Sequence, residues 1–289
     1  MQFVRRSTIA LFIILALTVT YCSPAVPQPS SSRGLTILLS NDDGYGAPGL
    51  EALIAALSPA GDVYVAAPAH NQSGKGHSVT NNQFLYVDAK PQSDGRTFYA
   101  IDATPATCVR LGLDELMPRK PDVVISGINY GENLGLTVYY SGTLGAAREA
   151  AMSGIPSIAV SMRGNDPSDY KAAAEYTRVL LDKLHQKNLL KPGLFLNLNF
   201  PSGRAKGIRI VQLSQVKDRE VYKRHTDAEG HLYFEQSWES TEETDERTDV
   251  WAFEHGFITL TPMTLDTTDV KSLNSLRWLE KDPTQAASQ

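Results

Sequence analysis

The stretch TILLSNDDGYGAPGLEALIAAL, residues 36–57, contains a strand, a loop and a helix in succession. Its first part is an apolar run that ends at Leu39, as expected of a buried strand. Apolar residues then recur at helical spacing at positions 50, 53, 54 and 57, and Pro48 suits the first helical turn. Asn41-Asp42-Asp43-Gly44 lies between the two elements, so two carboxylates directly follow a strand that is apolar enough to be buried.

The same alternation of apolar strands and helices continues through much of the chain. Strands are predicted at residues 62–67, 122–126, 157–161, 194–200 and 208–213, and helices at 143–152 and 170–184. Strands that are continuously apolar and separated by helices form a parallel sheet covered on both faces. The sequence therefore predicts an α/β domain with a mostly parallel sheet over residues 34–280.

Residues 217–249 differ from the rest of this domain because they are polar and carry isolated aromatic residues. Asp227-Ala228-Glu229-Gly230 is typical of a turn between two ribbon strands. One interpretation is a solvated, flexible insertion. The other is a protruding β-hairpin arm that packs on a second subunit or covers the site, because exposed aromatic residues favour a partner. A short helix at 250–256 and a strand at 257–260 follow, and we expect 281–289 to form a disordered tail.

The overall composition excludes several classes of function. The net charge of −5 over 289 residues gives no electrostatic reason to expect nucleic-acid binding. Six His and two Cys without a CxxC pair leave little room for a zinc cluster. No GxxxxGK[ST] is present, which disfavours a P-loop.

The N-terminus is expected to be a separate unit. Arg5 and Arg6 precede an apolar run at 9–19 that has the length of a signal-peptide core. We predict an export signal over 1–25 and a linker over 26–33, which implies export to the periplasm. Cys22 offers a weak lipoprotein position, since Tyr21 is too large for the usual preceding residue. An uncleaved N-terminal anchor is the alternative, and no other membrane contact is expected.

Cys108 is the one cysteine left after removal of such a leader. It cannot form an internal disulfide, and it lies in an apolar helical pattern after Thr104-Pro105. A packed core thiol is therefore favoured over a nucleophile.

Polar side chains follow three of the predicted strands at their carboxyl ends. Asn41, Asp42 and Asp43 follow the first strand, the loop that contains Ser73 follows the second, and Asn129 and Asn133 follow the strand at 122–126. Ligands of open parallel sheets bind at this edge, so we expect the three loops to converge. Carboxylate, hydroxyl and amide oxygens suit Mg²⁺ or Mn²⁺ rather than zinc. The alternative is a simple turn whose Asp residues cap the next helix.

A second polar group precedes the Ala-rich helix at 143–152. Ser141, Gly142 and Thr143 leave backbone N–H groups at a helix N-terminus, which favours an anion. A cation beside an anion site is what phosphate ester hydrolysis requires. The alternative is an ordinary helix cap by Ser141 or Thr143.

With these residues in hand, the chain resembles the SurE family of 5′/3′-nucleotidases. Ordered blocks carry the resemblance over residues 34–268: ILLSNDDGYGAPGLEAL, AAPAHNQSGKGHSVT, PDVVISGINYGENLG, YYSGTLGAAREAAMSGIPSIAVS and TDVWAFEHGFITLTPMTLD. The resemblance implies a Rossmann-like three-layer domain with an extended C-terminal hairpin arm exchanged between subunits. It also implies a homodimer or homotetramer held through 217–249.

The resemblance further implies one divalent cation per subunit, Mg²⁺ or Mn²⁺, and a nucleoside monophosphate substrate. The implied metal ligands are Asp42, Asp43, Ser73 and Asn129. The implied substrate and phosphate site is made of Asn133, Ser141, Gly142 and Thr143, and the residues assigned to catalysis are Asp42, Asp43, Asn41 and Ser141. The chain departs from the family pattern at Ala69-His70, Thr107 and Thr137.

These observations predict a metal-dependent phosphomonoesterase that releases phosphate from nucleoside 5′-monophosphates, and from 3′-monophosphates as a further expectation, by attack of an activated water. His77 is a candidate acid for the leaving oxygen, with an ordinary loop histidine as the alternative. A broad-specificity acid phosphatase with little base preference is the second candidate enzyme. An exported protein that binds phosphate without turnover is the candidate from another class.

Overall fold

The computed structural model describes residues 34–280. The predicted export signal, linker and C-terminal tail lie outside the described residues. Within 34–280, no helix combines the length and the apolar character needed to cross a membrane.

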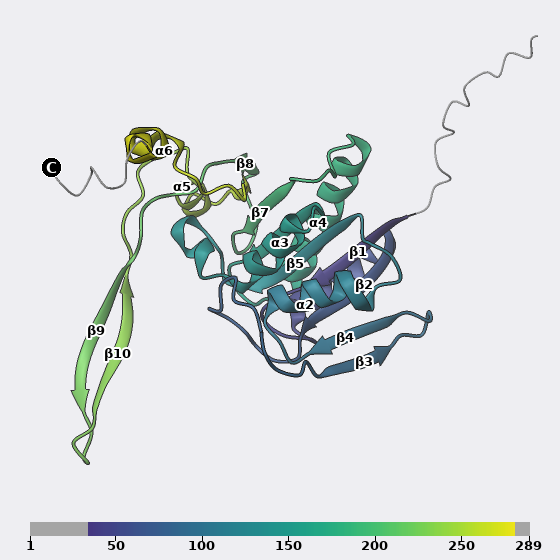
Figure 1. Cartoon of the computed structure of the whole chain (residues 1–289), viewed down its shortest axis with the longest axis horizontal. Coiled ribbons are helices and arrows are strands. Elements are labelled where there is room, and N and C mark those ends of the chain that lie inside the picture. Colours follow the sequence, from purple (N-terminus) through teal and green to yellow (C-terminus); the bar gives the residue numbers. More distant parts are fainter. Residues whose placement is uncertain (1–33, 281–289) are drawn as a thin grey trace, which may run out of the picture. The chain divides into compact units, whose positions relative to one another are not determined.

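A nine-stranded sheet forms the centre of the domain (Figure 1). Its strands are β1 (Leu35–Ser40), β2 (Gly61–Pro68), β3 (Val87–Pro91), β4 (Thr97–Ile101), β5 (Val123–Tyr130), β6 (Ser157–Met162), β7 (Phe195–Phe200), β8 (Ile208–Ile210) and β11 (Ile258–Pro262). The spatial order is β3-β4-β2-β1-β5-β6-β7-β11-β8. Only β3 with β4 and β11 with β7 pair antiparallel, so the predicted mostly parallel sheet is confirmed.

Helices α1 (Pro48–Leu57) and α4 (Pro167–Gln186) cover one face of the sheet, and α2 (Pro105–Leu111) and α3 (Gly142–Met152) cover the other. The remaining helical segments are α5 (Asp249–Glu254), α6 (Val270–Leu276) and the shorter turns η1 (Gly112–Leu116), η2 (Gly135–Tyr139) and η3 (Arg277–Glu280). Alternate residues of β1 divide between two apolar clusters. Ile37 and Leu39 pack with α1 and α4, whereas Leu38 packs with α2 and α3.

The order of the strands fixes where a ligand can enter. The chain runs from β1 through α1 to β2 on one side, and later returns to pair β5 with the other side of β1. The strand order therefore reverses between β1 and β5, and ligands of such sheets bind beyond the carboxyl ends of the strands at this position. The loops that begin at Asn41 and Asn129 lie there.

The polar segment forms a two-stranded sheet of its own, β9 (Arg219–Thr226) paired antiparallel with β10 (Leu232–Glu239) (Figure 1). The predicted hairpin arm is thus confirmed, with the turn at 227–230. Its residues are largely exposed, including Tyr222, Tyr233, Phe234 and Trp238.

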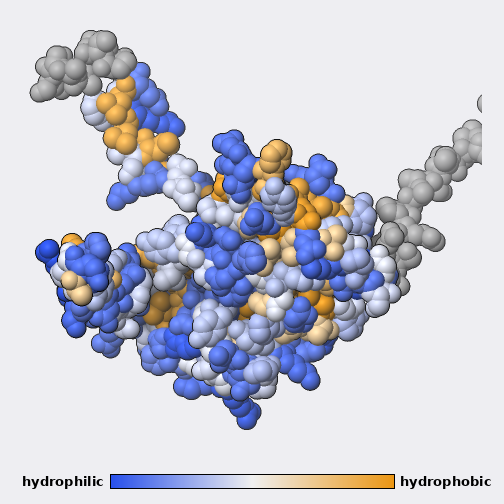
Figure 2. Space-filling view, turned by 90° about the horizontal axis from the view of Figure 1, so that it is seen from below, coloured by the Kyte–Doolittle hydropathy of each residue, from blue (hydrophilic) through white to orange (hydrophobic). Residues whose placement is uncertain are grey.

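The structure contains elements that the sequence patterns did not predict. The pair β3–β4 is absent from the prediction because its residues alternate irregularly and most of β3 is exposed. The predicted strand at 208–213 ends at Ile210. Helix α6 and η3 carry exposed apolar side chains at Val270, Leu273, Leu276, Trp278 and Leu279, and Figure 2 shows apolar surface on the segment next to the grey C-terminal residues.

Candidate active site

Asn41 shapes the turn that follows β1. Its Nδ2 donates to the carbonyl oxygen of Gly44 at 2.9 Å, and its Oδ1 accepts from the Gly44 N–H at 3.3 Å. Gly44 has a φ of 107°, which favours glycine. The buried Asn41 side chain is therefore engaged within the turn, and the catalytic role assigned to it stays a prediction.

Asp42 connects this turn to the start of α3. Asp42 is 3% exposed, and its carboxylate accepts a hydrogen bond from the Thr143 hydroxyl. A Cβ at Gly142 would lie 2.7 Å from the Cβ of Asp42, so only glycine allows the helix to approach this closely. Burial raises the pKa of Asp42, and hydrogen bonds from Thr143 and the Gly142 amide oppose that rise.

Asp43 is held by β5 on the other side of the turn. Its Oδ2 accepts from the Tyr130 N–H at 3.1 Å. Burial, and then the charge of Asp42, raise the pKa of Asp43 to about 6. Two adjacent carboxylates that are costly to ionise together would be stabilised by a cation placed between them, which fits the predicted metal role of Asp42 and Asp43.

Asn129 leaves the amide oxygen of its side chain as an available ligand. Its Nδ2 donates to the Gly131 carbonyl at 2.6 Å and to the Tyr130 carbonyl at 3.1 Å. The pairing of β5 with β6 shifts register between Ser126 and Asn129, and such a bulge redirects a side chain at a strand end. A buried amide oxygen with its nitrogen already bonded suits a hard cation, and the ligand role stays a prediction.

The loop that carries Ser73 is anchored at both ends. The Gln72 N–H donates to the Asp42 carbonyl at 2.7 Å, and the Gly76 N–H donates to the Tyr140 carbonyl at 2.9 Å. A Cβ at Gly145 would lie 2.3 Å from the Gly76 carbonyl oxygen, so α3 packs directly on this loop. Ser73 itself is exposed, and the structure places its loop, rather than its hydroxyl, against Asp42.

Ser141 is the N-cap of α3. Its Oγ accepts from the Leu144 N–H at 3.2 Å, so the predicted cap is present. The amides of Gly142 and Thr143 act on the Asp42 carboxylate and lower its pKa, less than burial raises it. The N–H groups at the start of α3 therefore stabilise negative charge, which is compatible with an anion site.

Asn133 lies against β6 and β7. Its Nδ2 donates to the Ser161 hydroxyl at 2.8 Å, and its N–H donates to Asn199 Oδ1 at 2.8 Å. Its carbonyl accepts from the side-chain amides of Asn197 and Asn199. The sequence patterns did not identify these two Asn residues as partners of Asn133. Their spacing of two in an apolar strand could have indicated it, because residues so spaced lie on one face of the strand.

Glu149 is a second residue that the sequence analysis missed. Its Oε2 lies 2.9 Å from His77 Nε2, and its Oε1 accepts from Arg110 Nε at 2.9 Å. Burial on its own would raise the pKa of Glu149, but the hydrogen bonds from Arg110 and His77 outweigh it and hold the pKa below its usual range. His77 is thus bound to α3, and its predicted acid role stays a prediction.

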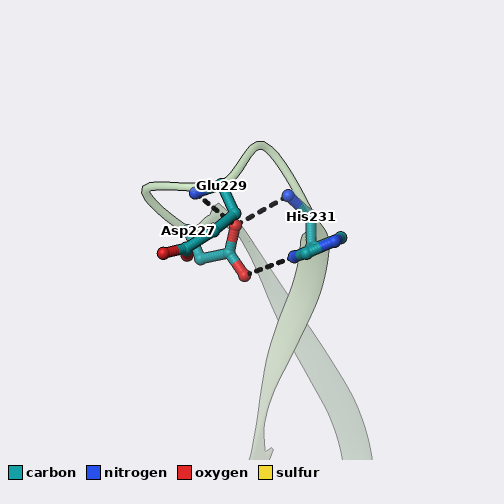
Figure 3. A group of neighbouring side chains, drawn as sticks. All are labelled: Asp227, Glu229 and His231. Atoms are coloured by element: carbon teal, nitrogen blue, oxygen red, sulfur yellow. Dashed lines mark hydrogen bonds and ion pairs between the residues drawn. The ribbon is translucent and has the colours of Figure 1, made fainter.

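A different group of candidate ligands lies at the hairpin turn. Asp227, Glu229 and His231 place one ligand atom each within 4.8 Å of one another, and all three are exposed (Figure 3). Asp227 accepts from the Glu229 and His231 N–H groups and lies 3.0 Å from His231 Nδ1. These bonds close the turn between β9 and β10, and such a turn needs no ion.

Comparison with known proteins places these loops in a family. A family model described as survival protein SurE matches residues 37–222. The chain is 39% identical to a 5′-nucleotidase SurE of Pelotomaculum thermopropionicum over 250 residues, which is 86% of this chain and 96% of that protein. It is 41% identical over 245 residues to one of Desulfitobacterium hafniense, covering 83% and 95% of the two chains. The crystal structure of a SurE protein from Aquifex aeolicus is 38% identical and superposes with a TM-score of 0.75, covering 85% of this chain and 100% of that one.

Proposed function

The chain belongs to the survival protein SurE family, and on that premise we propose that it is a phosphomonoesterase that releases phosphate from nucleoside 5′-monophosphates. Relatives that carry the name 5′-nucleotidase match it over nearly their whole length. The observation that carries the proposal is the hydrogen bond between Thr143 and Asp42, because it joins the acid pair to the helix start. Activity on 3′-monophosphates belongs to the same proposal.

We propose Asp42, Asp43, Ser73 and Asn129 as ligands of one Mg²⁺ or Mn²⁺ ion per subunit. The residues fit a hard cation, since they offer carboxylate, hydroxyl and amide oxygens and since two of the carboxylates are costly to ionise together. Such an ion, when bound, supplies positive charge that polarises a phosphoryl oxygen and makes water more acidic.

The chain's own groups would divide the remaining work. Thr143 fixes the Asp42 carboxylate by donating to its Oδ1, and Tyr130 fixes Asp43 in the same way. Asp42 is proposed to orient the attacking water and to accept its proton. We propose that Ser141, Gly142 and Thr143 hold the phosphate together with the buried Asn133.

Assembly and location complete the proposal. The exposed aromatic residues of the arm support a homodimer or homotetramer held through 217–249. Export follows from the predicted signal over 1–25. Size-exclusion chromatography with and without the arm tests the first, and N-terminal sequencing of secreted protein tests the second, because an intact Met1 there contradicts cleavage.

A substrate panel tests the activity. Purified protein is assayed with AMP, GMP, 3′-AMP and an aryl phosphate, after EDTA treatment and after addition of Mg²⁺ or Mn²⁺. We expect phosphate release that needs the cation and is faster for nucleotides. Equal rates on the aryl phosphate favour a broad phosphatase, and AMP binding without any phosphate release contradicts an enzyme.

A further inference from the structure

A large cavity borders the candidate active site. It has a volume of about 1060 Å³, and its wall contains Gly131, Glu132, Leu134 and Tyr140 together with residues from the base of the arm and from α5. This size matches that of small-molecule sites.

Residues in the wall of the cavity form hydrogen bonds with a predicted metal ligand and with the loop of another. The Gly131 carbonyl in its wall accepts from Asn129 Nδ2 at 2.6 Å. The Tyr140 carbonyl accepts from the Gly76 N–H at the end of the Ser73 loop, and Tyr140 directly precedes the cap of α3. A phosphate held at the start of α3 therefore has this cavity beside it to receive its ester substituent.

The charges in the wall exclude a second phosphate group. Arg163 is held between Glu132 and Glu254, so its guanidinium is already neutralised. Lys217 is the other Lys or Arg side chain in the wall, which also contains Asp218, Glu242 and Glu243. An acidic wall of this kind repels a further anion and suits an uncharged group with hydroxyl and amino donors.

Aromatic rings in the wall provide a surface for a flat ring. Trp238 is 58% exposed, so its face is accessible. Tyr140 is 55% exposed, but the Lys217 ammonium lies over its ring, 5.8 Å from the centroid. Trp251 also lies in the wall, but it stacks on His255 with ring centroids 3.7 Å apart. Trp238 at the base of β10 is thus the indole in the wall that is open to stacking.

We propose that this cavity receives the nucleoside part of the substrate, with the base stacked on Trp238. The proposal rests on the proposed nucleotidase function and names the group that would distinguish a nucleotide from other phosphate esters. Stacking of a base on an aromatic side chain is tolerant of base identity, so AMP and GMP are both expected to bind.

The test compares substrates with and without a base. Wild type, Trp238→Ala and Trp238→Phe are assayed with AMP and with ribose 5-phosphate. We expect Trp238→Ala to raise the KM for AMP roughly tenfold, with kcat and the KM for ribose 5-phosphate unchanged. Trp238→Phe is expected to restore most of the affinity for AMP.

Trp278→Ala is the matched control. Trp278 is also an indole, is 60% exposed, lies outside the arm and does not line the cavity. It is expected to behave as wild type with both substrates. Equal losses on AMP and ribose 5-phosphate in Trp238→Ala, or equal losses in both alanine variants, overturn the proposal.

A binding measurement tests the nucleoside cavity independently of the proposed nucleotidase activity. Adenosine has no phosphate, so its binding, measured by calorimetry on the full mature chain, reports on the cavity alone. Adenosine binding that is lost in Trp238→Ala supports the cavity even if AMP is not hydrolysed. AMP hydrolysis without an effect of Trp238 leaves the proposed function standing and overturns the cavity proposal.

Discussion

Two acidic groups of this protein offer similar ligand atoms in opposite surroundings. At the edge of the sheet, Asp42 and Asp43 are tied to α3 and β5, and burial raises the pKa of both. At the hairpin turn, Asp227, Glu229 and His231 are exposed and bond mainly to one another (Figure 3).

Proximity of carboxylates alone therefore does not define a metal site. Solvated acids can ionise at little cost, so the hairpin group is stable as a turn. Ionisation of the sheet-edge pair is unfavourable because both carboxylates are buried, and a bound cation would offset this cost. Residues with such perturbed pKa values concentrate at functional sites. The following measurements test this contrast.

Asp42→Asn is expected to have the largest effect. The variant loses a charged ligand and the proposed proton acceptor, so kcat for AMP should fall about 10²–10⁴-fold. Asp227→Asn is the control and should retain full activity. Thermal melting of both variants checks the fold, and near-normal turnover by Asp42→Asn would falsify the assigned role.

Cation binding should also separate the two groups. Saturating Mn²⁺ at about a hundred times its dissociation constant stabilises a folded site by roughly 2.7 kcal/mol. We expect this increase in wild type and in Asp227→Asn, and its loss in Asp43→Asn. Differential scanning calorimetry measures it, and a shift that disappears in Asp227→Asn instead would move the site to the hairpin.

A buried and an exposed His–Glu pair should differ in their contribution to the free energy of unfolding. Glu149→Gln disrupts the buried pair with His77 and the bond from Arg110, and we expect the free energy of unfolding to fall by about 2 kcal/mol. Glu235→Gln disrupts the exposed pair with His225, 3.0 Å apart, and should cost under about 1 kcal/mol. Urea unfolding gives both values, and equal effects would contradict the structural role of Glu149.

The smallest expected effect is a pH dependence of the metal-free protein. The pKa of Asp43 is raised from 3.8 to about 6, so folding favours its protonated form. Its stabilising contribution is complete below pH 3.8 and is lost as the pH rises through 6. The full rise in pKa corresponds to about 3 kcal/mol, which solvent screening of this partly exposed carboxyl reduces to about 1–2 kcal/mol. Unfolding of EDTA-treated wild type minus that of Asp43→Asn isolates this change. A difference that grows with pH has the wrong sign for a raised pKa.

The sequence predicted those parts of the protein in which one physical rule dominates. Buried strands such as β1 and β6 are apolar throughout, and α1 has an apolar face, so periodicity identified them. The edge pair β3–β4 has no such pattern because β3 is mostly exposed. In the site, Asp42 and Thr143 were identified from their positions at element ends. The role of Glu149 was not predicted, because its partners His77 and Arg110 come from distant segments that only the folded chain brings together.

Close backbone contacts around the site determine which of its loops can change position. A Cβ at Gly49 would lie 2.0 Å from the Ile128 carbonyl oxygen, so α1 is pressed against β5, and α3 is pressed in the same way against Gly76. Between the anchored amides of Gln72 and Gly76, the Ser73 N–H donates to Asn71 Oδ1 at 2.9 Å and the Lys75 N–H donates to the Gln72 carbonyl at 3.2 Å, so this stretch is held by bonds within its own loop. Three of the proposed ligands therefore lie on closely packed segments, whereas the exposed Ser73 lies on a loop held by its own bonds, so we expect its hydroxyl to be the ligand that moves most when an ion is captured or released.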